Sequence, residues 1–182
     1  GSEMCIRDRH RGFEVVVVEP YTVTLTRGGV IVDLYIHPSF AWIVYVDGGR
    51  LLEEVEEIDV DGVEARGLTR EAEVVAVVTH AIYKEHMYLL SDYYVVREWL
   101  NRRALSLAYE LNVVDSLEVA MSLNKLIEEG FIETPYKLSL PRVMVTLANR
   151  FARDSYFRGT SLNLLRNLDR ERTPRAIVSR LR

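Results

Sequence analysis

The apolar and polar positions divide the chain into an N-terminal half with strand-like alternation and a C-terminal half with a helical period. Short apolar or alternating runs between turn residues predict strands over 13–19, 21–27 and 30–37 and a short hairpin over 58–65. Gly28 and Gly29 provide a tight turn between the second and third strands. The apolar run 40–46 fits either a strand or a helix.

After Gly67 the apolar residues follow a helical period. Thr69 is a suitable N-cap, and Glu71 lies in the first turn, where a negative charge favours the helix dipole. Apolar residues on most sides of this segment predict a buried helix that runs to about residue 85. Further helices are expected over 88–100, 103–111, 116–129, 141–153 and from 161 to the end.

These elements predict an α+β fold, with a small mixed or antiparallel β-sheet followed by a helical domain. The expected boundaries are a sheet core over 10–67, a helical subdomain over 68–140 and a basic helical segment over 141–182. Residues 1–9 read as the in-frame translation of a transposase adapter used in sequencing libraries. We therefore expect this segment, with Cys5, to be foreign to the natural protein.

One acid interrupts the most apolar of the predicted strands. Asp33 lies among β-branched and aromatic residues, and a carboxylate in a buried strand must be hydrogen-bonded, paired or bound to metal. Strand alternation places Asp33, Tyr35 and His37 on one face and their apolar neighbours on the other, which we expect to be core. Asp33 is therefore a candidate functional residue.

A second polar group interrupts the apolar helix after Gly67. His80 and Lys84 are four residues apart, so an α-helix would place them on one face. A lysine in such a helix is costly without a partner, and Asp92 in the next predicted helix is a suitable one. Two interpretations remain open: a salt bridge between two antiparallel helices, or a cationic pair directed at phosphates.

Composition is that of an ordinary globular chain, with 182 residues, 48% hydrophobic and 27% charged. The single cysteine excludes an internal disulfide framework and a cysteine-based zinc site. No apolar run approaches the roughly 20 residues that span a bilayer, so we expect no membrane association and a cytoplasmic location. Glutamine is absent and arginine far outnumbers lysine, which favours a thermophilic source, although a GC-rich genome also favours arginine. We expect a thermophilic archaeon known from metagenomic DNA.

Charge is unevenly distributed along the chain. Residues 142–182 hold ten arginines against three acids, a local net charge of about +7, so the remainder carries about −11 to give the total of −4. The basic segment could dock on nucleic acid or a protein partner. Alternatively, its arginines could pair with the acidic N-terminal half or solvate a helical bundle. The acidic residues over 53–64 are interpreted as a solvated face rather than as a cation site.

The order of these features resembles uncharacterised nucleotidyltransferase families of the DNA polymerase β-like superfamily. The resemblance rests on the strand 32–37 with Asp33, the segment 68–73, then His80 and Asp92, and it covers residues 12–100. In that superfamily an Asp-x-Asp pair after a glycine-containing turn precedes a third carboxylate, which Asp33 resembles. The resemblance implies a magnesium-dependent transfer of a nucleoside monophosphate from a nucleoside triphosphate to an acceptor that the sequence does not identify.

The resemblance also implies roles for individual residues. Asp33 would be the catalytic, metal-binding carboxylate, and His80, Lys84, His37 and Tyr35 would contact substrate, with Asp92 as a structural neighbour. Related families often have histidine at the position of Tyr35. No Asp-x-Asp pair precedes Asp33 in this chain. Because one carboxylate cannot hold two magnesium ions, we expect a distal fragment that is inactive by itself.

Two further interpretations belong to other functional classes. The segment 115–138 has the rhythm of a winged helix, in which Asn124 and Lys125 are the clear candidates for contacting bases or phosphates. A DNA-binding regulator would use that helix together with the basic C-terminal segment. The alternative is a nucleotidyltransferase-like antitoxin or other interaction protein, in which the helical half forms an interface.

Overall fold

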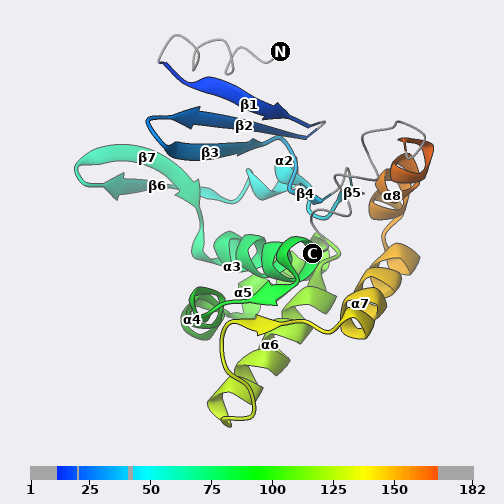
Figure 1. Ribbon diagram of the computed structural model, residues 1–182. Helices are drawn as coiled ribbons and strands as arrows, with labels where there is room; N and C mark the ends of the chain where they lie inside the picture. Colours follow the sequence, from blue (N-terminus) through cyan, green and yellow to red (C-terminus); the bar gives the residue numbers. More distant parts are fainter. Residues whose placement is uncertain (1–11, 20, 41–42, 168–182) are drawn as a thin grey trace.

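The computed structural model describes residues 12–19, 21–40 and 43–167. The expectations for residues 1–9, including Cys5, and for the last fifteen residues lie outside the described part. Figure 1 shows a β-sheet on one side of a group of helices, with two further helices packed along the edge of that group. The α+β expectation of a small antiparallel sheet followed by a helical domain is confirmed.

The N-terminal sheet has three antiparallel strands in the order β1-β2-β3. These strands are β1 (Glu14–Val18), β2 (Thr22–Arg27) and β3 (Val30–Tyr35). The β2–β3 turn is formed by Gly28 and Gly29, whose φ values of 56° and 83° favour glycine. The register pairs Thr24 with Asp33. The third strand ends two residues earlier than predicted, at Tyr35.

Two small hairpins and one short helix connect the sheet to the helical domain. The run 40–46, for which strand and helix were both open, contains β4 (Ser39–Phe40) and β5 (Ile43–Val44). Asp47 then caps α2 (Gly48–Leu51) by accepting a hydrogen bond from the Gly49 amide. The predicted hairpin over 58–65 is present and longer, as β6 (Val55–Val60) and β7 (Val63–Leu68).

The helical domain begins where predicted. Thr69 caps α3 (Arg70–Thr79) through a hydrogen bond from the Ala72 amide to its hydroxyl. The helix continues as a π-helix, η1 (His80–Glu85). The elements that follow are β8 (Met87–Tyr88), α4 (Leu90–Trp99), α5 (Arg102–Glu110), α6 (Val114–Glu128), β9 (Tyr136–Lys137), α7 (Leu140–Arg153) and α8 (Ser155–Asn167).

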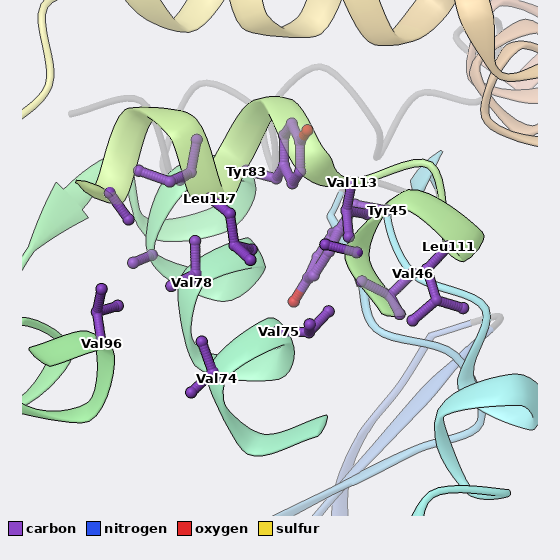
Figure 2. Packing of buried hydrophobic residues seen from close by; sticks show 14 of the residues in the cluster. Tyr45, Val46, Val74, Val75, Val78, Tyr83, Val96, Leu111, Val113 and Leu117 are labelled. Carbon is purple, nitrogen blue, oxygen red and sulfur yellow. The ribbon is translucent and has the colours of Figure 1, made fainter. Parts of the chain in front are cut away.

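The hydrophobic core belongs to the helical domain and is centred on α3 (Figure 2). Val74, Val75 and Val78 of α3 are fully buried against residues from α4, α5 and α6 and from the segment after β5. The β1–β3 sheet contributes no residue to this cluster. The expectation that the apolar face of β3 would be core is therefore wrong, because Val32 and Leu34 are only partly buried.

Candidate functional site

A small polar cavity lies between the β1–β3 sheet and η1. Its volume is about 70 Å³. The cavity is lined by Val17, Glu19, Thr22, Thr24, Asp33, Tyr35, Ser39 and Lys84. Three of the residues that the sequence singled out, Asp33, Tyr35 and Lys84, thus meet in one place. Hydroxyl groups, two carboxylates and one ammonium group together make a site suited to polar ligands.

Lys84 reaches the sheet from η1, the π-helical end of the helix that begins as α3. Its Nζ atom donates a hydrogen bond to the Tyr35 hydroxyl at 2.5 Å and lies 5.0 Å from the centre of that ring. Such a contact combines a charged donor with a cation–π interaction. Of the two open interpretations, the salt bridge between Lys84 and Asp92 is not formed, because Lys84 contacts the sheet instead of the next helix.

Asp33 is exposed, contrary to the expectation of burial in a core strand. The cause is that its face of the sheet borders the cavity and solvent instead of packing against helices. Its Oδ1 atom accepts a hydrogen bond of 2.6 Å from the Thr24 hydroxyl, the residue directly opposite on β2. This bond orients the carboxylate, and the second oxygen remains available for a ligand.

His37 does not share the face of Asp33, because β3 ends before it. Its Nδ1 atom accepts a hydrogen bond of 3.0 Å from the Gly48 amide at the start of α2. The Asp47 carboxylate lies 3.6 Å from the same nitrogen, but an accepting Nδ1 carries no proton to form an ion pair. A Cβ atom on Gly48 would collide with the carbonyl oxygen of Ile36, so the close approach that seats His37 requires glycine.

His80 is held outside the cavity by two hydrogen-bond partners. Its Nδ1 atom lies 3.2 Å from the hydroxyl of the buried Tyr45, and its Nε2 atom lies 3.2 Å from Oε1 of Glu85. Burial, and next the charge of Lys84, lower the pKa of His80. Burial raises the pKa of Tyr45, so its hydroxyl stays protonated and lies within hydrogen-bond reach of Nδ1 of His80.

The spacing of these contacts reflects the wider turn of the π-helix. Hydrogen bonds in a π-helix join residues five apart, and His80 pairs with Glu85, five residues on. The helix expected to about residue 85 is present, and its last six residues have π geometry instead of α. Lys84 Nζ also lies 4.0 Å from the same Glu85 oxygen. Glu85 thus connects two residues that the sequence proposed as a cationic pair.

Asp92 has a structural contact at the start of α4. Its Oδ2 atom accepts a hydrogen bond of 2.7 Å from the Leu89 amide, which has no partner within the helix. The residue is 8% exposed, and this burial raises the pKa of its carboxyl. Asp92 does not line the cavity and does not contact Lys84.

The described residues do not by themselves form a magnesium site. Magnesium is bound by carboxylates together with waters and substrate phosphates in near-octahedral geometry. Within the described ranges, no group of three histidine, cysteine or acidic side chains is placed to hold a metal ion. Asp33 and the nearby hydroxyls could provide part of a coordination shell, but not the two-ion arrangement that the family resemblance implies.

The winged-helix interpretation conflicts with the burial of α6. Asn124, its main candidate for reading bases, is 7% exposed; its Oδ1 accepts from the Tyr88 hydroxyl at 2.7 Å and its Nδ2 donates to the Tyr93 carbonyl at 3.1 Å. Residues 130–138, which a winged helix would use as its wing, contain β9, and β9 pairs with β8 rather than with a strand of the same segment. The side chain of Asn124 is therefore buried and already hydrogen-bonded, so it is not available to contact bases in a DNA groove.

The described part of the arginine-rich segment already contains ion pairs. Arg150, 3% exposed, donates to Asp154 Oδ2 at 3.1 Å and stacks between the rings of Tyr83 and Phe157. Arg153 of α7 donates to Asp115 of α6 at 2.8 Å. Asp154 belongs to the basic segment itself and Asp115 to α6, so neither ion pair is with the acidic N-terminal half that the sequence interpretation named. The arginines from Arg170 onward lie outside the described residues.

Sequence reasoning missed several residues of the cavity. Thr22 and Thr24 line it from β2, and Ser39 lines it from the short β4. The sequence did carry a signal for the threonines. Thr22, Thr24 and Thr26 alternate with apolar residues in the strand next to that of Asp33, so they share one face of it. Ser39 had no such signal, because its position depends on how the chain leaves the sheet.

Among the described helices, none combines the length and the apolar character needed to cross a bilayer.

Comparison with known proteins gives no assignment. No family model, no curated protein and no solved structure matches the chain. The candidate site therefore depends on its own geometry, and the nucleotidyltransferase resemblance remains an expectation based on the residues named above.

Proposed function

We propose that the chain is the distal part of a nucleotidyltransferase, which transfers a nucleoside monophosphate from a nucleoside triphosphate to an acceptor of unknown class. The cavity between β3 and η1 is the place where this chain meets the nucleotide. In such a transfer the acceptor hydroxyl loses its proton to a base and its oxygen bonds to the α-phosphorus. The bond from that phosphorus to the oxygen bridging to the β-phosphorus breaks, and pyrophosphate leaves with the electron pair. The magnesium ion enters as part of the magnesium–triphosphate substrate.

A single observation supports this proposal. Tyr35 and Lys84, which lie 49 positions apart in the sequence, are hydrogen-bonded in the cavity that also contains Asp33. The Lys84 ammonium group is a suitable partner for a phosphate oxygen, and the free oxygen of Asp33 for the acceptor hydroxyl or the substrate's magnesium. The sequence selected Asp33 and Lys84 on separate grounds, so their meeting in one cavity favours a shared role.

The proposal includes an expectation of incompleteness. A cavity of about 70 Å³ is much smaller than the 300–1,000 Å³ typical of a complete ligand site. The two carboxylates of the cavity, Glu19 and Asp33, are also fewer than the three that the resemblance implies for holding two metal ions. We therefore expect the chain to contact one end of the nucleotide weakly and to transfer none by itself.

The test is binding of the magnesium complexes of ATP, GTP, CTP and UTP to the whole chain, followed by NMR. We expect weak, saturable shifts in β3 and η1 with at least one nucleotide. Lys84→Met and Asp33→Asn should each weaken binding about tenfold, because each removes a charge-assisted contact. Asp59→Asn is the control, since it removes an exposed carboxylate from the β6–β7 hairpin.

Either of two results would overturn the proposal. One is the absence of any shift at millimolar nucleotide. The other is binding that Lys84→Met and Asp33→Asn leave unchanged. A separate assay with radiolabelled nucleoside triphosphates addresses incompleteness: incorporation by the chain alone would support the class of enzyme and contradict the expected inactivity.

A further inference from the structure

A groove between α6 and α7 is lined by polar side chains, and none of them lines the cavity at Lys84. Its volume is about 250 Å³. Each helix lines the groove with four residues whose spacing places them on one helix face: Asp115, Glu118, Val119 and Ser122 of α6, and Arg142, Val145, Thr146 and Asn149 of α7. Sites for drug-sized molecules occupy about 300–1,000 Å³, so this groove suits a smaller ligand.

One of the two acids in the groove wall is already paired. Asp115 in the first turn of α6 accepts a hydrogen bond of 2.8 Å from Arg153 in the last turn of α7. The start of α6 therefore lies beside the end of α7. This pair leaves one acid, Glu118, and one base, Arg142, as the remaining charged groups of the groove wall.

These two remaining charges have no partner among the described residues. Glu118 is exposed and makes neither a hydrogen bond nor an ion pair with its side chain there. The Arg142 guanidinium also makes none within the same ranges, and its Nη1 atom is buried. A guanidinium group that is partly shielded from water interacts more strongly with a carboxylate than a fully hydrated one does.

Glu118 and Arg142 lie toward different ends of the groove. Glu118 is one turn after Asp115, whereas Arg142 is about three turns before Arg153, which contacts Asp115. A ligand with a single charge would meet an opposite charge at one end of the groove and a like charge at the other. A ligand with one charge of each sign would meet an opposite charge at both ends.

We propose that the α6–α7 groove binds a small zwitterion, an amino acid. The ammonium group of the ligand lies at Glu118, and its carboxylate accepts hydrogen bonds from the Arg142 guanidinium. Val119 and Val145 contact the carbon atoms between the two charges, and the Asn149 amide offers a further polar contact. This site is separate from the nucleotide cavity and does not depend on the function proposed for it.

The first test is a titration of the whole isotope-labelled chain followed by NMR. The probes are three amino acids with increasing separation between their charges, glycine, β-alanine and γ-aminobutyrate, and two ions with one charge each, acetate and ethylammonium. We expect at least one amino acid to give saturable shifts in α6 and α7 at millimolar concentration. It should bind at least tenfold more tightly than either ion, because only the amino acid meets both charges of the groove.

The second test removes the two charges one at a time. Glu118→Gln and Arg142→Gln should each weaken binding of that amino acid about tenfold, since each removes one charge-assisted contact. The amino acid should then bind to Glu118→Gln no better than acetate does, and to Arg142→Gln no better than ethylammonium does. Two controls remove the same charges elsewhere and should leave binding unchanged: Glu128→Gln, an exposed acid of α6 outside the groove wall, and Arg102→Gln, an exposed base at the start of α5.

Three results would overturn the proposal. The first is the absence of shifts in α6 and α7 with all three amino acids. The second is a single ion that binds as tightly as the best amino acid, since one of the two charges would then be unnecessary. The third is equal weakening by Glu118→Gln and Glu128→Gln, because the net charge of the chain, and not the groove, would then determine the affinity.

Discussion

The helical domain and the β1–β3 sheet differ in how their apolar residues are used. In the helical domain, Val75, Val78 and Ile82 are completely buried. In the described strands of the sheet, Leu25 is the one apolar residue that is buried, and Ile31 is 71% exposed. Stability therefore resides in the helices, whereas the sheet supplies polar groups to the cavity. The candidate chemistry lies where the two regions meet.

The largest expected difference between the two regions follows from truncating the same residue type in each. Ile82→Ala removes a fully buried side chain and should lower the free energy of unfolding by about 2–5 kcal/mol. Ile31→Ala, its match in the sheet, should change it by less than about 0.5 kcal/mol. Urea unfolding followed by circular dichroism measures both. Equal losses would show that the sheet is as well packed as the helices.

A smaller effect concerns the contact that joins the regions. Lys84→Met and Tyr35→Phe, alone and combined, form a double-mutant cycle across the hydrogen bond between η1 and β3. We expect a coupling energy of about 1 kcal/mol, because the donor, the Lys84 ammonium group, is charged and the pair is partly buried. Hydrogen exchange should also become faster in β3 and remain unchanged in α3. Strict additivity would mean that this bond does not hold the sheet.

The smallest expected effect is a pH dependence that originates in the helical domain. Burial lowers the pKa of His80 and of His86, so the unfolded chain binds more protons than the folded chain below about pH 6.5. Their contribution to stability is therefore present above that pH and is lost as the pH falls. Asp92, whose pKa burial raises, acts in the opposite direction at lower pH.

Urea unfolding at about pH 7.5 and about pH 5.5 measures this dependence. The wild-type chain should lose stability at the lower pH, and His80→Gln should lose less, because one of the two histidines no longer titrates. Lys84, Glu85 and Asp92 remain in place in that variant, so their charges are common to both measurements. An identical pH dependence for the two proteins would remove His80 as the cause.

Local signals in the sequence predicted local structure well. The glycine turn of β2–β3, the hairpin around Asp61-Gly62 and the cap at Thr69 depend on residues within a few positions, and all three are present. The α+β division followed from the change of period after Gly67. These features were predictable because turn and cap preferences are carried by the residues themselves.

The features that failed depend on long-range packing. The exposure of Asp33 follows from the helices packing elsewhere, and a strand pattern alone does not show which face is covered. The contact of Lys84 with Tyr35 joins residues 49 positions apart in the chain. Thus the sequence indicated which polar residues to examine, and tertiary packing determined which of them meet.

The π-helix also sets the rotational phase between two parts of one continuous helix. Each residue of an α-helix advances the chain by about 100° around the axis, and a π turn accommodates one residue more than an α turn. Shortening 80–85 by one residue would rotate the following chain relative to α3 by that angle. Lys84 would then turn away from the sheet while Val75 and Val78 kept their places. The extra residue in the turn of η1 thus rotates the end of the helix, so that α3 packs in the core while Lys84 of η1 lines the cavity.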